Sequence, residues 1–177
     1  MKTKLVKSDI PGGRWPQIRG SHWVVSCWRD HRDAHGKFHL DTREWFGFIY
    51  KITFLLTGER YLGKKAFHRV TKYGRVLGAS PWRSYTSSSD NLNKLLRTYP
   101  KECFLFEIIL LCKTKGGWSY AEANLLHRSD VLTERDGLGE RRYLNGNISA
   151  IKWIPKEFDG PDFAYTVKTY IRRNLWE

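Results

Sequence analysis

Alternating apolar and polar side chains predict a strand that begins at Gly47. One face of this strand carries four bulky side chains at every second position: Phe48, Tyr50, Ile52 and Phe54. Thr57-Gly58 follows as a turn, because glycine accepts backbone angles that other residues avoid. Residues 60–65 then form a shorter strand. The pattern therefore predicts a β-hairpin that carries Tyr50 on its first strand and Tyr61 on its second.

Helical and strand periodicities divide the middle of the chain. Apolar residues recur at helical spacing after a run of serines that can cap a helix, and Pro100 closes that helix (Leu92, Leu95, Leu96 and Tyr99). The run from Cys103 to Cys112 is apolar on both faces except at Glu107, which predicts a buried central strand. A Gly116-Gly117 turn then leads into a second helix, expected from Ser119 to about Glu134.

Less regular segments surround these elements. Residues 1–46 are expected to be an irregular basic and aromatic arm with one short helix at most, and residues 68–81 a loop that contacts DNA. The C-terminal extension, 149–177, contains a helix candidate from Phe163 to Trp176. We expect one α/β domain over residues 47–148, built on a small, mainly antiparallel three-stranded sheet (the hairpin plus 103–112) flanked by helices.

Composition narrows the compartment and the class of partner. The 177 residues contain 31 Lys+Arg against 18 Asp+Glu, a net charge of +13, which favours nucleic acid or an anionic membrane surface as partner. No apolar run is long enough for a membrane span, and the N-terminal lysines lack the apolar stretch of a signal peptide. We therefore expect a cytoplasmic protein with no membrane contact. Its three cysteines predict no disulfide framework, and Cys103 and Cys112, which flank an apolar strand, are most simply core or near-core thiols.

The positive charge is concentrated beside the hairpin. Between residues 60 and 83 there are seven cations and no acid: Arg60, Lys64, Lys65, Arg69, Lys72, Arg75 and Arg83. A charge run is most simply a solvated surface. Its position next to two tyrosines favours a footprint for the phosphate backbone of DNA.

Cysteine and histidine residues in the arm leave a metal site open as an alternative. Cys27, His31, His35 and His39 recur every fourth residue, a spacing that would align them on one helix face. A zinc site is one interpretation. Gly36 interrupts the helix, and the spacing matches no common zinc module, so histidines on the surface or facing DNA are the alternative.

The hairpin carries a motif. Phe48-Ile49-Tyr50, preceded by Gly47, and Tyr61-Leu62-Gly63 resemble the two halves of the motif that defines the GIY-YIG nuclease superfamily. One residue is inserted after the first glycine, and leucine replaces isoleucine in the second half. Trp82-x-x-Tyr85, the serine run and Ser119-Tyr120-x-Glu122-Ala123 resemble small bacteriophage-encoded members in particular. The resemblance covers about residues 47–148.

Membership would imply a metal-dependent DNA endonuclease that hydrolyses phosphodiester bonds with water activated by a tyrosine. Tyr50 or Tyr61 would be the general base, and Glu122 would bind one Mg²⁺ or Mn²⁺. Lys64 and Lys65 are placed to lower the pKa of the phenols and to hold the phosphate. The late asparagine of the family would be Asn145, with Asn147 competing, and its arginine would be Arg83 in preference to Arg69 or His68. With one centre per chain, double-strand cleavage would take a homodimer on DNA or two successive nicks, in the host cytoplasm if the protein is phage-encoded.

Simpler interpretations exist for the same residues. Ser119-x-x-Glu122 is a capping box, the tyrosines suit cross-strand packing, and Asn145-Gly146 suits a turn. DNA contacts are expected from five residues outside the catalytic group or at its margin: Arg60, Arg69, Lys72, Arg75 and Tyr85. The competing functions are a non-catalytic nucleic-acid-binding protein on the same fold and a phage-type factor that binds a protein.

Overall fold

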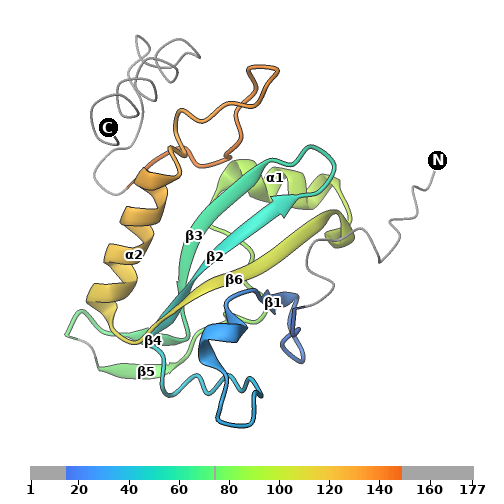
Figure 1. The fold of residues 1–177 in the computed structure, drawn as a ribbon. Helices are drawn as coiled ribbons and strands as arrows, with labels where there is room; N and C mark the ends of the chain where they lie inside the picture. Colours follow the sequence, from blue (N-terminus) through green and yellow to red (C-terminus); the bar gives the residue numbers. More distant parts are fainter. Residues whose placement is uncertain (1–14, 74, 149–177) are drawn as a thin grey trace, which may run out of the picture.

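A four-stranded sheet forms the centre of the molecule. The computed structural model describes residues 15–148 apart from Gly74, so the C-terminal extension with its expected helix lies outside the described residues. The strand order is β1 (Trp23–Val25), β6 (Phe104–Cys112), β2 (Gly47–Phe54) and β3 (Arg60–Ala66), as Figure 1 shows. β1 runs parallel to β6, whereas β2 is antiparallel to both β6 and β3. The expected α/β class and the antiparallel three-stranded part are confirmed, and β1 is an additional strand.

The hairpin has a register that matters for the site. β2 and β3 pair so that Tyr50 lies opposite Gly63 and Ile52 lies opposite Tyr61. Gly58 in the connecting turn has a φ of +79°, the left-handed conformation that the turn requires of a glycine. On the other side of β2, Lys51 lies opposite Glu107 of β6, and their charged atoms are 2.8 Å apart. The only acid of the predicted central strand is therefore buried as an ion pair.

Two helices complete the fold. α1 (Asp90–Thr98) begins at Ser89, whose hydroxyl accepts a hydrogen bond from the Leu92 backbone N–H, as the serine run predicts. α2 (Lys115–Arg128) begins four residues before the expected start and ends six residues before the expected end. Thr114 caps α2 by accepting a hydrogen bond from the Gly117 N–H at 3.1 Å. The capping-box interpretation of Glu122 is therefore wrong, because Glu122 lies in the second turn of the helix.

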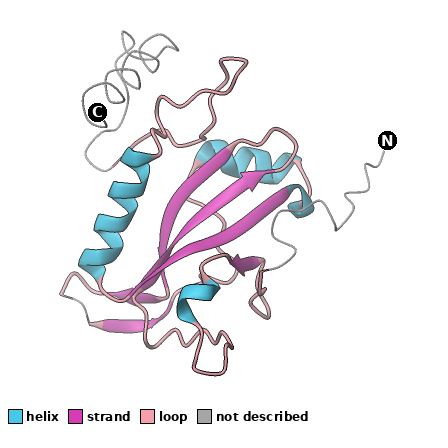
Figure 2. Ribbon diagram, in the orientation of Figure 1, coloured by secondary structure: helices cyan, strands magenta, loops and turns pink. Residues whose placement is uncertain are grey.

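The two faces of the sheet are covered by different parts of the chain. A large aromatic core fills one face and includes Phe48, Tyr50, Trp82 and Leu92 of α1. α2 packs on the other face, where a smaller cluster joins Leu126 to side chains of the sheet and of the following loop. Figure 2 shows α2 running alongside β3, with α1 behind the sheet. The central strands are thus buried on both sides, as their composition predicts.

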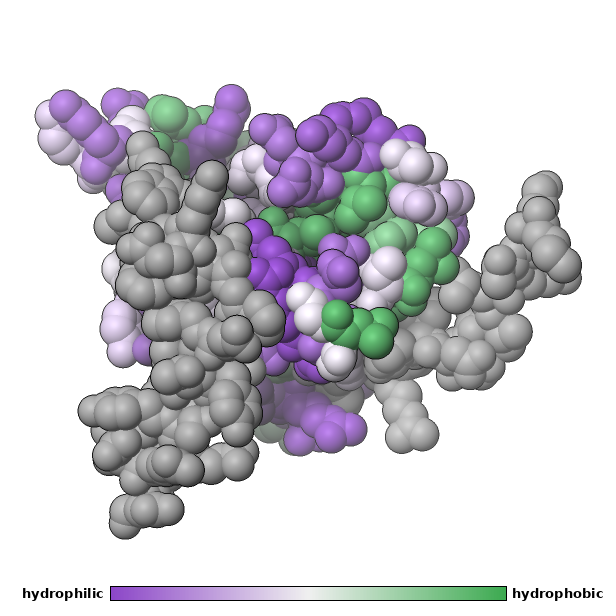
Figure 3. All heavy atoms as spheres, turned by 90° about the horizontal axis from the view of Figure 1, so that it is seen from above, coloured by the Kyte–Doolittle hydropathy of each residue, from purple (hydrophilic) through white to green (hydrophobic). Residues whose placement is uncertain are grey.

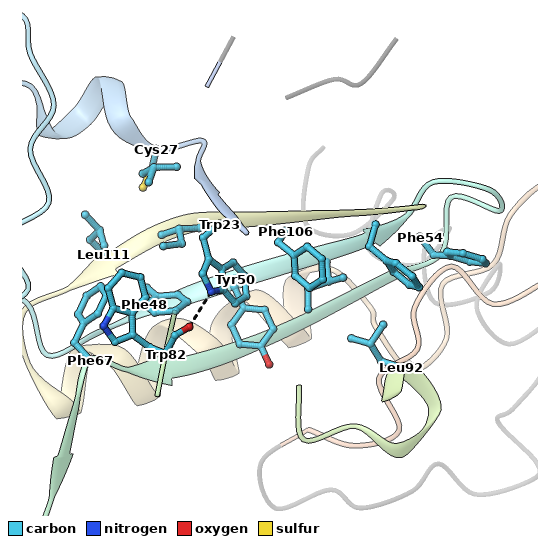
Figure 4. Close-up of a cluster of buried hydrophobic side chains, with 14 residues drawn as sticks. Trp23, Cys27, Phe48, Tyr50, Phe54, Phe67, Trp82, Leu92, Phe106 and Leu111 are labelled. Carbon is cyan, nitrogen blue, oxygen red and sulfur yellow. Dashed lines mark hydrogen bonds between the residues drawn. The ribbon is translucent and has the colours of Figure 1, made fainter. Parts of the chain in front are cut away.

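Residues 15–46, the part of the N-terminal arm that the structure describes, contribute to this core. Trp23 and Val25 of β1 are fully buried, and the Trp23 indole N–H donates a 2.9 Å hydrogen bond to the Trp82 carbonyl. Figure 4 shows Trp23 packed against Tyr50 and Phe48, with ring centroids 5.2 Å and 5.3 Å apart in tilted and edge-on arrangements, and draws this hydrogen bond as a dashed line. The short helix expected in the arm is a 3-10 turn, Trp28–His31. The arm is consequently less irregular than the sequence suggests, because β1 pairs with a strand about 80 positions later.

Residues 68–81 are not the expected loop. β4 (His68–Val70) and β5 (Val76–Ala79) pair antiparallel as a separate two-stranded sheet. This sheet lies beyond the end of the main sheet (Figure 1). Gly residues at 74 and 78 suggested a loop, but the strands are joined by a short turn and are stabilised by their own backbone pairing.

Both edges of the main sheet are occupied by short segments. Beside β3, the Arg60 N–H donates to the Arg142 carbonyl at 2.8 Å and the Leu144 N–H donates to the Arg60 carbonyl at 2.7 Å. Asn145 continues this pairing through its side-chain amide, which donates to the Leu62 carbonyl and accepts from the Leu62 N–H. Beside β1, the Val25 N–H donates to the Pro16 carbonyl at 3.0 Å.

Replacement of Trp23 by alanine tests whether the arm belongs to the core. We expect Trp23→Ala to lower the free energy of unfolding by about 3–5 kcal/mol, because it removes a fully buried indole and its hydrogen bond. The control is Trp45, which is partly buried and packs at the margin of the same core. Its replacement by alanine should lower the free energy of unfolding by less. Urea denaturation measures both. A loss at Trp23 no larger than that at Trp45 would contradict the assignment.

Candidate active site

The two hairpin tyrosines lie side by side on one face of the sheet. The ring centroids of Tyr50 and Tyr61 are 6.1 Å apart. Tyr50 is 1% exposed, whereas Tyr61 at the edge strand is only partly buried. In Figure 4 the Tyr50 hydroxyl points away from Trp23 and out of the labelled aromatic cluster. Of the two phenols, Tyr61 is therefore the one that a solvent molecule can reach more easily.

Gly63 makes room for both rings. A Cβ atom at this position would lie 2.6 Å from Cζ and from the hydroxyl oxygen of Tyr50, and 3.0 Å from the Tyr61 ring. Real Cβ atoms do not approach other heavy atoms this closely. The backbone conformation of Gly63 is not left-handed, so it is the lack of a side chain, rather than flexibility, that this position requires. The glycine of the second half-motif thus has a direct steric role.

A third phenol and two serines surround the pair. The Tyr85 ring lies 6.2 Å from that of Tyr50, and the Lys65 ammonium nitrogen lies 3.8 Å from the centroid of the Tyr85 ring. Tyr85 and Ser87 lie close enough to Tyr50 to act on its pKa, and Ser87 and Ser88 act in the same way on the pKa of Tyr61. The segment before α1 therefore connects the two motif tyrosines through Ser87.

Both phenols are held in the neutral form. Burial raises the pKa of Tyr50 far above its usual range, and the neighbouring Tyr61 and Tyr85 act in the same direction. Burial also raises the pKa of Tyr61, while the neighbouring Ser87 and Ser88 oppose this and the negative charge of Glu122 adds to it. The expectation that Lys64 and Lys65 lower the pKa of the phenols is wrong for this structure.

Lys64 points to the opposite face of β3 and joins the site to α2. Its ammonium lies 2.9 Å from Oε2 of Glu122, donates to the Ser119 hydroxyl at 3.3 Å and lies 4.5 Å from the centroid of the Trp118 ring. These partners lie on one side of α2, where helical spacing brings residues 118, 119 and 122 together. The Glu122 carboxylate therefore lies on the face of β3 opposite to the two phenols, and its charge is the smallest of the influences that act on the pKa of Tyr61.

Lys65 remains on the phenol face. Alternation along β3 places Tyr61, Gly63 and Lys65 on one side of the sheet, and Leu62 and Lys64 on the other. Burial lowers the pKa of the Lys65 ammonium, because the charged form loses part of its hydration. Two cations thus flank the edge strand from opposite faces, one paired with a carboxylate and the other resting on an aromatic ring.

Asn145 is buried and supports the second motif strand. Its side-chain oxygen accepts from the Leu62 N–H at 3.0 Å and its amide nitrogen donates to the Leu62 carbonyl at 2.8 Å. This pairing fixes the backbone between Tyr61 and Gly63. Asn147, the competing candidate, is exposed. The bracing role expected for the late asparagine is thus exerted on the strand backbone.

The expected arginine is not found at the tyrosines. Arg83 donates from its guanidinium to the Arg19 carbonyl at 2.8 Å and stacks on Trp82, 4.5 Å from the ring centroid. His68 forms a 2.9 Å hydrogen bond with the Thr42 carbonyl, and Arg69 lies on β4 beside Gly78. No contact among the described residues brings any of the three to Tyr61 or Glu122. The role foreseen for Arg83 in the catalytic group is therefore unsupported by its contacts.

Two grooves lie outside the tyrosine group. One, of about 540 Å³, lies between the β2–β3 turn and residues 136–142 and contains Arg60 together with Glu59, Asp136 and Glu140. Viewed from this end of the molecule, hydrophilic side chains surround a smaller hydrophobic area (Figure 3). The other, of about 570 Å³, contains Arg83 and Lys101. Arg141 and Arg142 line the same groove as Arg60, so its three acids are matched by three arginines and Arg60 stays a predicted DNA contact.

Glu122 offers the chemistry that a single Mg²⁺ prefers. Mg²⁺ binds carboxylate oxygens, keeps several of its waters and is completed by substrate phosphates, so one carboxylate at the edge of a basic surface suits it.

In residues 15–148, Gly74 aside, no group of three or more His, Cys, Asp or Glu side chains could hold a metal ion. The zinc interpretation of Cys27, His31, His35 and His39 is wrong, because the 3-10 turn ends at His31 and Cys27 is buried.

Some site residues were not singled out from the sequence. Ser87 and Ser88 contact the phenols, and Trp118 contacts both Lys64 and, through a 3.2 Å hydrogen bond, the Phe48 carbonyl. The serine run was noticed as a helix cap and as part of the resemblance, but no pattern linked it to the tyrosines. That link requires the sheet and the segment before α1 to be placed together in space.

Comparison with known proteins agrees with this arrangement. A family model described as "Putative endonuclease segE, GIY-YIG domain" matches residues 31–148, two thirds of the chain. The chain belongs to the GIY-YIG nuclease superfamily. No curated relative and no solved structure matches it. Membership agrees with the two half-motifs on β2 and β3, and members of this superfamily are nucleases, whose substrates are nucleic acids.

In the part of this GIY-YIG chain that the structure describes, no helix has the length and apolar character to cross a bilayer.

A methyl group at Gly63 should disturb the phenols. We expect Gly63→Ala to lower the free energy of unfolding by about 1–3 kcal/mol, because the added Cβ overlaps the Tyr50 ring. Gly116→Ala is the control, since its Cβ would meet nothing within 4 Å and alanine favours a helix. Thermal unfolding distinguishes them. Equal effects of the two substitutions would show that Gly63 is not under steric constraint.

Proposed function

We propose that this protein is a DNA endonuclease that hydrolyses phosphodiester bonds at the outer edge of β3. The proposal rests on one observation above others, the 2.9 Å ion pair that joins Glu122 of α2 to Lys64 on β3, the strand that also carries Tyr61. It is supported by the family, whose members are nucleases, and by the acid-free basic segment around the site. Hydrolysis of a phosphodiester needs a proton acceptor for water and positive charge near the phosphate, and both kinds of group occur here.

Tyr61 is the better candidate for the proton acceptor. It is more exposed than Tyr50, and the neighbouring Ser87 and Ser88 lower its pKa, against the larger effect of burial. Tyr50 is almost fully buried and is therefore better suited to fix the position of Tyr61 and Ser87. In this arrangement Tyr61, once its own phenol proton has been released to solvent, would take the proton of the attacking water, and Lys65, on the same face of β3, would neutralise charge that develops on the phosphate.

Glu122 is the residue that would hold the metal ion. Bound Mg²⁺ would polarise the phosphate, and its charge would counter the effect by which Glu122 raises the pKa of Tyr61. The carboxylate has two oxygens, of which Oε2 is bonded to Lys64. Lys64 therefore holds the carboxylate in place toward the sheet edge, and Ser119 orients Lys64 from one turn below.

Glu122→Gln tests the proposal. With supercoiled plasmid and Mg²⁺, we expect wild-type protein to nick DNA and the variant to be at least ~100-fold slower, because an amide lacks the charge that holds a cation. EDTA should abolish wild-type cleavage. Glu102→Gln, at an exposed acid outside the site, is the matched control. Cleavage at the wild-type rate by Glu122→Gln would remove the carboxylate from the mechanism, and DNA binding without any cleavage would favour the non-catalytic alternative.

Comparison of two phenylalanine variants tests the assignment of the base. We expect Tyr61→Phe to reduce the cleavage rate by about 10²–10⁴-fold, the usual loss when a general base is removed. Tyr50→Phe should reduce it less, since the buried ring is retained and only its hydrogen bonds are lost. Single-turnover rates at several pH values measure both, and the rise of rate with pH should disappear in Tyr61→Phe alone. A larger loss at Tyr50 would reverse the two roles.

A further inference from the structure

The β4–β5 hairpin is an unusual surface for this molecule. Three of the eight exposed large apolar side chains in the described residues lie on it: Tyr73 is 85% exposed, Val76 58% and Leu77 60%. Its two strands pair only with each other, with a bulge between Arg69 and Val70. Exposed apolar side chains on a two-stranded ribbon that stands apart from the main sheet typically mark a binding surface.

The charge of the same hairpin indicates the partner. Arg69, Lys72 and Arg75 are exposed, and no acidic residue occurs between positions 60 and 89. An acid-free ribbon with three cations complements a polyanion. A two-stranded β-ribbon has dimensions that fit the major groove of a DNA duplex, where cations contact the phosphates and apolar side chains contact the thymine methyl groups.

The hairpin is attached rigidly to the candidate active site. β3 ends at Ala66 and β4 begins at His68, so the fully buried Phe67 alone separates them. The Phe67 N–H donates to the Phe46 carbonyl at 3.0 Å, and the Ser80 N–H donates to the Phe67 carbonyl at 2.9 Å. His68 is tied to the Thr42 carbonyl. A duplex held by the hairpin would therefore be fixed relative to Lys64 and Lys65.

We propose that the β4–β5 hairpin enters the major groove of duplex DNA and positions the strand to be cut. This inference rests on the proposed function only for the choice of DNA as substrate. Arg69, Lys72 and Arg75 contact phosphates on either side of the groove. Base edges are contacted by Tyr73 at the turn and by the face of β5 that is turned to the groove, Val76 and Leu77 lying on its two opposite faces. The hairpin thus binds and orients DNA, whereas the hydrolytic groups lie on β3 and α2.

Binding measured without metal separates this inference from cleavage. Fluorescence anisotropy with a labelled 30-bp duplex in EDTA, at several salt concentrations, compares the wild type with the triple variant Arg69→Ala, Lys72→Ala, Arg75→Ala. We expect the triple variant to bind on the order of tenfold or more weakly and its salt slope to fall by about 2–3, because each phosphate contact contributes about 0.9. A second triple variant with the same loss of charge is the control: Lys94→Ala, Arg97→Ala, Arg128→Ala, all exposed and elsewhere.

Further measurements test separately which groove of the duplex the hairpin occupies and whether DNA is its partner. Methyl green, which occupies the major groove, should displace the wild type, and netropsin, which occupies the minor groove, should not. Replacement of Val76 and Leu77 by serine should weaken binding without changing the salt slope. Equal binding by the two triple variants, displacement by netropsin alone, or a hairpin-dependent affinity for phosphatidylserine vesicles in place of DNA would overturn the inference. Hairpin-dependent binding without cleavage would contradict the proposed function alone, and hairpin-independent cleavage would contradict this inference alone.

Discussion

The close approach of the Tyr50 phenol to the bare backbone of Gly63 is the constraint on which the site depends. Tyr50 lies on the middle strand of the three longer ones, so its position is fixed from both sides by β6 and β3. The phenol can lie over β3 only because position 63 lacks a side chain. That contact brings the Tyr50 ring beside Tyr61, and the serines before α1 then reach both hydroxyls. The packing of both motif rings against β3 thus depends on one missing Cβ.

The candidate site is assembled from side chains on both faces of β3. Tyr61 and Lys65 project to the aromatic core, and Lys64 projects to α2, where Glu122 receives it. In the interior of a sheet, groups on opposite faces would be separated by the backbone layer. β3 is the outermost of the long strands, with only residues 142–145 paired beside it along Arg60–Leu62, and the charge of Glu122 still raises the pKa of Tyr61 slightly. The position of β3 as an edge strand is what allows α2 to contribute to a site that begins on the hairpin.

Local sequence patterns predicted the helices and strands better than they predicted the contacts between them. Period-two alternation and Thr57-Gly58 defined the hairpin, and the apolar run ending at Cys112 defined β6, because each is a property of neighbouring residues. β1 was missed because three residues are too few to show a period, and its partner lies about 80 positions away. The start of α2 was misplaced because glycines at 116 and 117 suggested a turn. Tyr50, Tyr61, Lys64 and Glu122 were identified from spacing and family resemblance, whereas the position of Arg83 depended on a carbonyl at Arg19 that no pattern reveals.

The segments beside β1 and β3 affect the behaviour of the chain at high concentration. An exposed strand edge offers unpaired N–H and C=O groups to another molecule and can start aggregation. Here the backbone of residues 142–144 and the Asn145 amide occupy those groups along Arg60–Leu62, and Pro16 and Ile18 occupy them along β1. Asn145 imitates a peptide unit with its side chain, so the pairing stops there without presenting a new edge. Asn145, which supports the strand of the second half-motif, therefore also keeps this edge of the sheet from pairing with another molecule.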